Sequence, residues 1–280
     1  MLSKKILRGT VQALFRGSTR FFMITCDKPE RTETDMEHSE AYMSFKNKML
    51  HFQDDVEIID IFYKEVKEKT WKNKGALFDT FDEKRHKNIS RYRLCNDNRN
   101  LIVTHLRATL YAAYVKELYE EMTAYLKNII LESYCNAMRD PGRIVGEHSF
   151  NMSAIEILKA VRTGNIEKVI IDNIFQSLES ERSTISLIKK VCKKIGIEVD
   201  KELIDRAVFY LDIRHKLVHT DGRVDESFKR EHPTLKYTAG NYIKLTYKTL
   251  LDMEKAVFTL VEVIDTDCLK KGLLKDHLKK

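Results

Sequence analysis

The chain has 280 residues, of which 43% are hydrophobic and 32% are charged, so it is long enough to bury a substantial core. Its three prolines and ten glycines are too few for a many-stranded all-β fold, which needs frequent turns. The net charge of +7 does not indicate a basic binding face, because the surplus lies in residues 1–20 and 270–280 and the chain between them is close to neutral.

The five cysteines are widely spaced and include no CxxC pair. This pattern indicates free thiols in a reducing compartment, and it favours neither a disulfide framework nor a zinc site. The sequence has no apolar run long enough to cross a membrane. We therefore expect a soluble, cytoplasmic protein that needs no metal and no cofactor. The basic, acid-free start also loosely resembles an organelle transit peptide, although a basic helix is the simpler interpretation.

Residues 1–95 predict a mostly helical N-terminal extension of unknown role. Its strongest apolar periodicity predicts a long helix over residues 36–71, with a candidate break at residues 53–55. Weaker patterns predict a strand over residues 20–26 and a short helix over residues 76–87, and the polar residues 88–100 predict a domain boundary.

Residues 100–266 predict an all-α bundle, and residues 267–280 form a basic tail. A long apolar stripe predicts a core helix over residues 101–138, ended by Asp140-Pro141-Gly142. A capping box at Ser153, Gly164, Gly196 and a cap at Asp200 delimit the helices that follow. These helices are predicted over residues 154–163, 166–178, 183–195, 200–218 and 247–264, with an irregular polar stretch over 223–240 and a brief extended piece over 242–245.

Five tyrosines crowd the predicted core helix, and core packing is their expected use, with base stacking as the alternative. They are Tyr111, Tyr114, Tyr119, Tyr125 and Tyr134. Three histidines lie alone in the sequence and are expected to be solvated: His105, His148 and His232.

The segment Arg214-His215-Lys216-Leu217-Val218-His219 interrupts the pattern of its helix. Arg214 falls on the apolar stripe, between Tyr210/Leu211 and Val218, where an arginine is costly unless it meets an anion or another partner. One interpretation is a buried pair with a carboxylate or a helix carbonyl. The other is an arginine held at a groove, ready for a phosphate.

His215 and His219 are four residues apart and therefore share a face of this helix. His219 lies in the last helical turn, where the helix dipole favours the imidazolium form and the nearby Arg214 opposes it. A histidine balanced near neutral pH suits proton transfer. From the spacing alone, a solvated histidine that satisfies helix carbonyls is the simpler interpretation.

An arginine, a polar residue and a histidine near the end of an apolar helix, followed by a glycine turn, resemble the Arg-x4–6-His motif of the HEPN superfamily. The order of predicted helices over roughly residues 100–266 is also similar to that of RiboL-PSP-like HEPN domains. The spacing alone is unspecific, because four Arg-x4–6-His matches occur in the chain. Only Arg214–His219 combines the spacing with the expected helix order, and Arg99–His105 is the credible decoy.

The resemblance implies a metal-independent endoribonuclease that acts as a homodimer, with two motifs in one groove. Arg214 would bind the scissile phosphate, His219 would act as base or acid, and His215 would support them. The products would carry 2′,3′-cyclic phosphate and 5′-hydroxyl ends. By family habit the protein would be a toxin-like or antiphage effector acting on tRNA or other RNA, under an antitoxin or sensor protein.

Two alternatives remain open. Many HEPN domains lack activity, so this domain could be a non-catalytic module for dimerisation, nucleotide binding or partner recruitment. The third interpretation is a helical scaffold unrelated to the HEPN superfamily.

Overall fold

The computed structural model describes residues 38–68, 84–86, 96–136, 141–146, 149, 151–180, 183–238 and 240–277. Within these ranges every regular element is a helix, which confirms the all-α prediction, and no helix is both long and apolar enough to cross a membrane. The candidate strand at 20–26 lies outside the described residues, and so does most of the predicted helix at 76–87.

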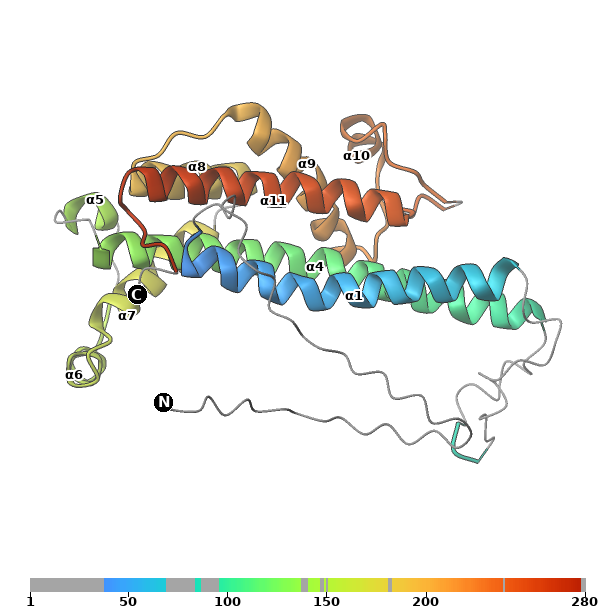
Figure 1. The fold of residues 1–280 in the computed structure, drawn as a ribbon, viewed down its shortest axis with the longest axis horizontal. Coiled ribbons are helices and arrows are strands. Elements are labelled where there is room, and N and C mark those ends of the chain that lie inside the picture. The colour runs from blue at the N-terminus through green and yellow to red at the C-terminus, as the bar shows by residue number, and fades with distance from the viewer. Residues whose placement is uncertain are drawn as a thin grey trace, which may run out of the picture. The chain divides into compact units, whose positions relative to one another are not determined.

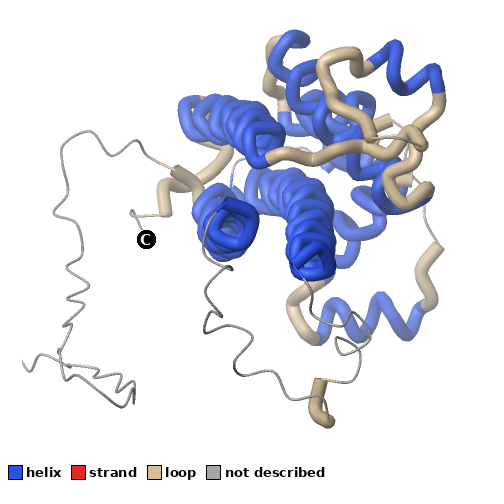
Figure 2. The backbone as a smooth tube through the Cα atoms, turned by 90° about the vertical axis from the view of Figure 1, so that its right-hand side faces the viewer, coloured by secondary structure: helices blue, strands red, loops and turns tan. Residues whose placement is uncertain are grey.

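Three long helices form the centre of the fold (Figure 1): α1 (Glu40–Glu68), α4 (Asn96–Asn136) and α11 (Tyr247–Lys270). α1 runs antiparallel to α4, and α11 runs parallel to α4, as the side-chain pairs between them show. Figure 2 shows the long helices nearly end-on, side by side. The interior between them holds most of the buried apolar side chains of α1, α4 and α11.

The predicted break at residues 53–55 is wrong, because α1 is continuous through it. Asp54 and Asp55 point to solvent, while Val56 and Ile59 on the opposite side are buried. Polar residues on the outer face of an amphipathic helix do not interrupt its backbone hydrogen bonds.

The tyrosines of α4 use their hydroxyl groups to join the long helices. The Tyr111 hydroxyl donates to Asp60 on α1 (3.0 Å), and the Tyr114 hydroxyl donates to Glu254 on α11 (2.9 Å). Tyr125 lies within 3.3 Å of both the Val261 carbonyl and Asp265. Burial, reinforced by the neighbouring carboxylates, raises the pKa of all three hydroxyls. These three tyrosines are therefore core residues, as predicted.

The beginning of α1 is anchored on α11 through one buried carboxylate. Asp265 is fully buried; it accepts a hydrogen bond from the Ser39 amide (3.0 Å) and another from the Ser39 hydroxyl. His277, near the C-terminus, lies next to the beginning of α1, since its amide donates to the His38 carbonyl (3.0 Å). The described part of the predicted N-terminal extension thus packs directly on the helices that follow it.

Shorter helices follow α4 in the chain: α5 (Pro141–Val145), α6 (Ala154–Arg162), α7 (Ile166–Glu179) and α8 (Thr184–Ile195). Of these, α5, α7 and α8 pack against α4, whereas α6 packs against α7. The capping box predicted at Ser153 and Glu156 is present, and Gly196 ends α8 in the left-handed conformation. α4 ends at Asn136, ahead of the predicted stop at Asp140-Pro141-Gly142. Pro141 opens α5, because proline fits the first turn of a helix.

The stretch 223–240 is less irregular than predicted. It contains α10 (Glu226–Glu231), capped by Asp225, whose side chain accepts from the Phe228 amide (2.8 Å). Phe228 and Leu235 are buried against the bundle. Phe228 is the one buried apolar residue within α10 itself, which is too few to produce a helical period, so the sequence pattern missed this helix.

Candidate functional site

The predicted motif lies at the end of α9 (Lys201–His219). The Asp200 side chain caps the first turn by accepting from the Glu202 amide, as predicted. At the other end, the Lys216 carbonyl accepts from the amides of Thr220 (3.1 Å) and Gly222 (2.9 Å). Gly222 has φ 80°, so the chain turns sharply and pairs back with residues 241–243.

We predict that Gly222→Ala lowers the free energy of unfolding by about 1–2 kcal/mol, because the left-handed conformation strains any residue with a Cβ. Gly222→Asn should cost less, since asparagine tolerates this conformation better. Urea denaturation of the two variants and the wild type measures both effects. An alanine variant as stable as the wild type would contradict the strain.

Arg214 lies where α9 leaves the core. Leu211, one turn earlier, is buried, whereas Val218, one turn later, is 39% exposed and does not continue the predicted stripe. The Arg214 guanidinium carbon lies 4.6 Å from the centre of the Tyr119 ring on α4, which is a cation–π contact. Tyr119 is therefore the partner of Arg214 that the sequence did not reveal.

No carboxylate or helix carbonyl pairs with Arg214 in the described part of the chain, and its buried Nε atom has no hydrogen-bond partner there. This arrangement differs from the first interpretation that the sequence allowed, a buried pair with a carboxylate or a helix carbonyl. A partly buried guanidinium without an acceptor retains hydrogen-bonding capacity for an anionic ligand, and phosphate oxygens match its planar fork.

His215 and His219 lie together on the exposed side of α9, as their spacing predicts. Their ring centres are 4.6 Å apart and their planes are tilted by 48°. Partial burial, together with the charges of His219, Lys216 and Arg214, lowers the pKa of His215. The lowered pKa favours the neutral imidazole form of His215 near neutral pH.

Arg214 and His219 leave α9 in different directions. Five residues advance a helix by about 500°, so the two side chains start about 140° apart around the axis and about 7.5 Å apart along it. Arg214 turns toward α4 and Tyr119, and His219 turns outward with His215. The His219 ring therefore contacts the His215 ring, whereas the Arg214 guanidinium lies against Tyr119 on another side of the helix.

On its other side the motif helix packs against α10. Lys216 lies 3.3 Å from Asp225 and above the Phe228 ring. His232, predicted to be solvated, is buried between the rings of Phe209 (4.5 Å) and Phe228 (4.2 Å), and its Nδ1 atom has no partner in the described residues. The prediction for His232 is therefore wrong, because the sequence did not show that α10 folds back onto α9.

Asp212 lies beside His232, with 3.9 Å between its Oδ2 atom and the His232 Nε2 atom. Partial burial and the neighbouring Glu231 raise the pKa of Asp212 to about 6, and burial lowers the pKa of His232. Each shift favours the neutral form of its group.

The raised pKa of Asp212 makes a pH-dependent prediction. Asp212 stabilises the fold in its protonated form, and that stability is lost as the pH rises through about 6. Asp212→Asn should therefore be more stable than the wild type at about pH 7.5, and the difference should vanish below about pH 4. The gain will be modest, because the Asp212 side chain is half exposed. Thermal unfolding across this pH range tests the prediction, and a gain that persists at the acidic end would contradict it.

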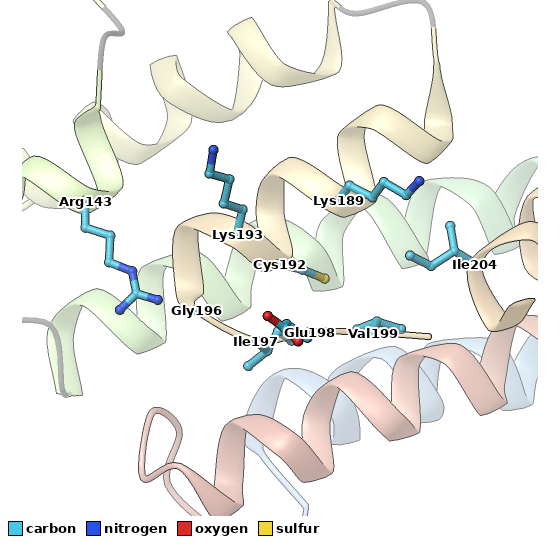
Figure 3. A pocket seen from close by; sticks show the side chains of 9 residues that line it. All are labelled: Arg143, Lys189, Cys192, Lys193, Gly196, Ile197, Glu198, Val199 and Ile204. Carbon is cyan, nitrogen blue, oxygen red and sulfur yellow. The ribbon is translucent and has the colours of Figure 1, made fainter. Parts of the chain in front are cut away.

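A cavity of about 560 Å³ lies away from the motif, near the start of α9 (Figure 3). Arg143, Lys189 and Lys193 line it with Glu198, above an apolar floor that includes Ile204. In Figure 3 the amino groups of the two lysines point in different directions, and neither points toward Arg143. The cations do not converge on one point, so we place the candidate site at the motif and not in this cavity.

The other Arg-x4–6-His matches lack such a setting where the structure describes them. In the decoy Arg99–His105, His105 is exposed on α4, and among the described residues its side chain forms a hydrogen bond only with Thr109. In the remaining two matches, Arg31 and His148 lie outside the described residues.

The cysteine prediction can be followed for three of the five thiols. Cys135, Cys192 and Cys268 are free thiols, and Cys26 and Cys95 lie outside the described residues. Across the ranges that the structure covers, no three His, Cys, Asp or Glu side chains cluster as a metal site would require.

No protein-family profile matches the chain, and no curated protein or solved structure shows significant similarity to it. The family resemblance, the catalytic activity and the partners therefore stay predictions.

Proposed function

We propose that the chain is an endoribonuclease of the HEPN type that uses Arg214 and His219 at the end of α9. The observation that supports this most is the state of Arg214. Its guanidinium rests on Tyr119 without a carboxylate partner in the described residues, one turn from an exposed histidine pair. An arginine without an acceptor can stabilise charge on a phosphate and an accessible imidazole can transfer protons, and phosphodiester cleavage uses both.

In the proposed reaction Arg214 binds the scissile phosphate and stabilises the charge that develops on its oxygens. His219 removes the proton from the ribose 2′-hydroxyl, which attacks the phosphorus, and the 5′-oxygen leaves with a proton. The products are a 2′,3′-cyclic phosphate and a 5′-hydroxyl end. His215 supports His219 through the contact between their rings.

A homodimer explains how side chains that leave α9 about 140° apart serve one phosphate. Two copies that pair near the ends of their α9 helices would place Arg214 of one copy beside His219 of the other. A second histidine would then be available to protonate the leaving oxygen. The RNA that is cut, such as a tRNA, and a neutralising or sensor partner belong to the same proposal.

The experiment compares RNA cleavage by the wild type, Arg214→Ala and Arg214→Lys in the presence of a metal chelator. We expect the wild type to cleave and Arg214→Ala to lose about 10²–10³-fold in rate. Lysine should restore little, because it cannot bind phosphate bidentately. Arg206→Ala is the matched control, since Arg206 is exposed on the same helix. Loss of wild-type cleavage on chelation, or full activity of Arg214→Ala, would contradict the proposal.

Mixing two inactive variants tests whether the site is shared. If Arg214 and His219 act across a dimer, Arg214→Ala mixed with His219→Ala should be more active than either variant alone. The limit is about one quarter of wild-type activity, because half of the dimers are mixed and each pairs one intact Arg214 with one intact His219, without the second His219 that would protonate the leaving oxygen. A mixture as inactive as its components would place both residues in one copy. A monomeric mass at micromolar concentration, with and without RNA, would also contradict a shared site.

A non-catalytic HEPN module is the alternative function. It predicts that the wild type binds RNA or a partner without cleaving RNA under any of these conditions.

A further inference from the structure

We propose that His215 and His219 together bind one divalent transition-metal ion of the zinc type, and that this ion inhibits the proposed ribonuclease. The inhibition rests on the proposed function, whereas the binding does not. The ion would be a reversible inhibitor and not a cofactor of the reaction.

The distance between the two rings fits a shared ion. A zinc–nitrogen bond is about 2.0–2.1 Å long and the imidazole centre lies roughly 1.1 Å behind the nitrogen, so each ring centre would lie about 3.2 Å from the ion. At a nitrogen–metal–nitrogen angle of about 90–110°, two ring centres are then about 4.5–5.3 Å apart. The observed separation is 4.6 Å, with the ring planes tilted by 48°. Two histidines four residues apart on one helix face are also a recurrent zinc-binding arrangement.

Both imidazoles are available to a ligand. His215 and His219 are exposed, and within the described chain neither is held by a hydrogen bond or an ion pair. Their rings contact each other. An ion could therefore bind without breaking an existing interaction.

The two neighbouring cations are engaged elsewhere. Lys216 lies 3.3 Å from Asp225 on the α10 side of the helix. Arg214 lies over Tyr119 on the α4 side. Both positive groups are thus drawn away from the outward face that the histidine pair occupies.

The site would have two protein ligands, because the described residues contain no group of three potential ligands. Structural zinc sites have four protein ligands and catalytic sites usually have three. A two-ligand site leaves the remaining positions to water, so binding should be reversible. An ion on one ring nitrogen of His219 would place a positive charge on the imidazole and so oppose its uptake of a proton from the ribose, which would inhibit cleavage.

Titration calorimetry of the metal-free, untagged full chain with ZnCl₂, in the absence of RNA, tests the binding. We expect His215→Ala and His219→Ala each to weaken binding at one site by about tenfold or more, because each removes one arm of a chelate. His105→Ala, which removes an exposed histidine without a histidine neighbour among the described residues, should bind as the wild type does. All four proteins share the same cysteines, so thiol binding cancels in the comparison. Wild-type Zn²⁺ affinity and stoichiometry in both motif variants would overturn the inference.

Cleavage assays separate this inference from the proposed function. If both hold, Zn²⁺ inhibits the wild type, and any activity left in His215→Ala requires about tenfold more Zn²⁺ for half-inhibition. Cleavage that Zn²⁺ does not inhibit would overturn the inference and leave the ribonuclease proposal standing. Zn²⁺ binding by the histidine pair in a chain that never cleaves RNA would support the metal site and overturn the ribonuclease.

Discussion

Replacing His219 with alanine will lower the rate of RNA cleavage by about 10²–10⁴-fold, which is the usual contribution of a general acid or base. The loss should lie in the chemical step, because His219 is exposed at the end of α9 and the proposed phosphate contact belongs to Arg214. Single-turnover cleavage at saturating protein measures this step directly. The fold should not suffer, since exposed side chains without partners contribute little to stability.

Two other histidine variants serve as comparisons for the cleavage rate of His219→Ala. His215→Ala should lose less activity than His219→Ala, because His215 only supports its neighbour in the proposed reaction. His105→Ala should cleave at the wild-type rate, although it belongs to another Arg-x4–6-His match. If His219→Ala cleaved as fast as the wild type, His219 would have no chemical role.

Asp265→Ala will lower the free energy of unfolding by about 3–5 kcal/mol, because it breaks a fully buried polar network. The Ser39 amide and hydroxyl would lose their acceptor inside the protein, and the Tyr125 hydroxyl would keep only the Val261 carbonyl. Since Ser39 begins the α1 side of the bundle, the loss should also loosen the packing of α1. Urea denaturation measures the change in stability, and hydrogen exchange of the α1 amides measures its location.

Two variants control for the loss of the Asp265 carboxylate. Asp265→Asn keeps one acceptor oxygen and should recover part of the stability. Asp252→Ala removes an exposed carboxylate from the same helix and should change stability by less than about 0.5 kcal/mol. If Asp265→Ala and Asp252→Ala were equally stable, Asp265 would not anchor the start of α1.

The helices were predictable wherever apolar residues recur with the helical period and a capping residue marks the end. Ser153, Asp200, Gly196 and Gly222 delimit their helices as predicted, because caps act through hydrogen bonds within a few residues of sequence. The tyrosines of α4 were predicted as core residues because they lie on a helix with a long apolar stripe. Their carboxylate partners were not, since these come from α1 and α11, far away in the sequence.

The prediction failed where long-range packing decides the structure. His232 is buried only because α10 folds back onto α9 and encloses its ring between two phenylalanines. A lone histidine in a polar stretch carries no local signal of such an environment. The prediction of a helix break at residues 53–55 failed for the opposite reason. The polar residues there lie on the outer face of a continuous helix and do not interrupt it.

The candidate site was predictable in part. The spacing of His215 and His219 placed them on one face, and the structure places their rings in contact. The position of Arg214 on an apolar stripe indicated an unusual arginine, but its resting place on Tyr119 depends on how α4 and α9 pack. The spacing between Arg214 and His219 was the weakest signal, since the two side chains leave the helix in different directions.

The most direct test of the central claim, that Arg214 and His219 cleave RNA, compares a ribo-oligonucleotide with the same sequence bearing 2′-O-methyl groups, both in chelator. The proposed reaction requires a free 2′-hydroxyl as the nucleophile. We predict that the wild type cuts only the unmodified RNA, leaves 2′,3′-cyclic phosphate and 5′-hydroxyl ends, and loses this cleavage in His219→Ala. Equal cleavage of the two oligonucleotides, or products with 5′-phosphate ends, would contradict it.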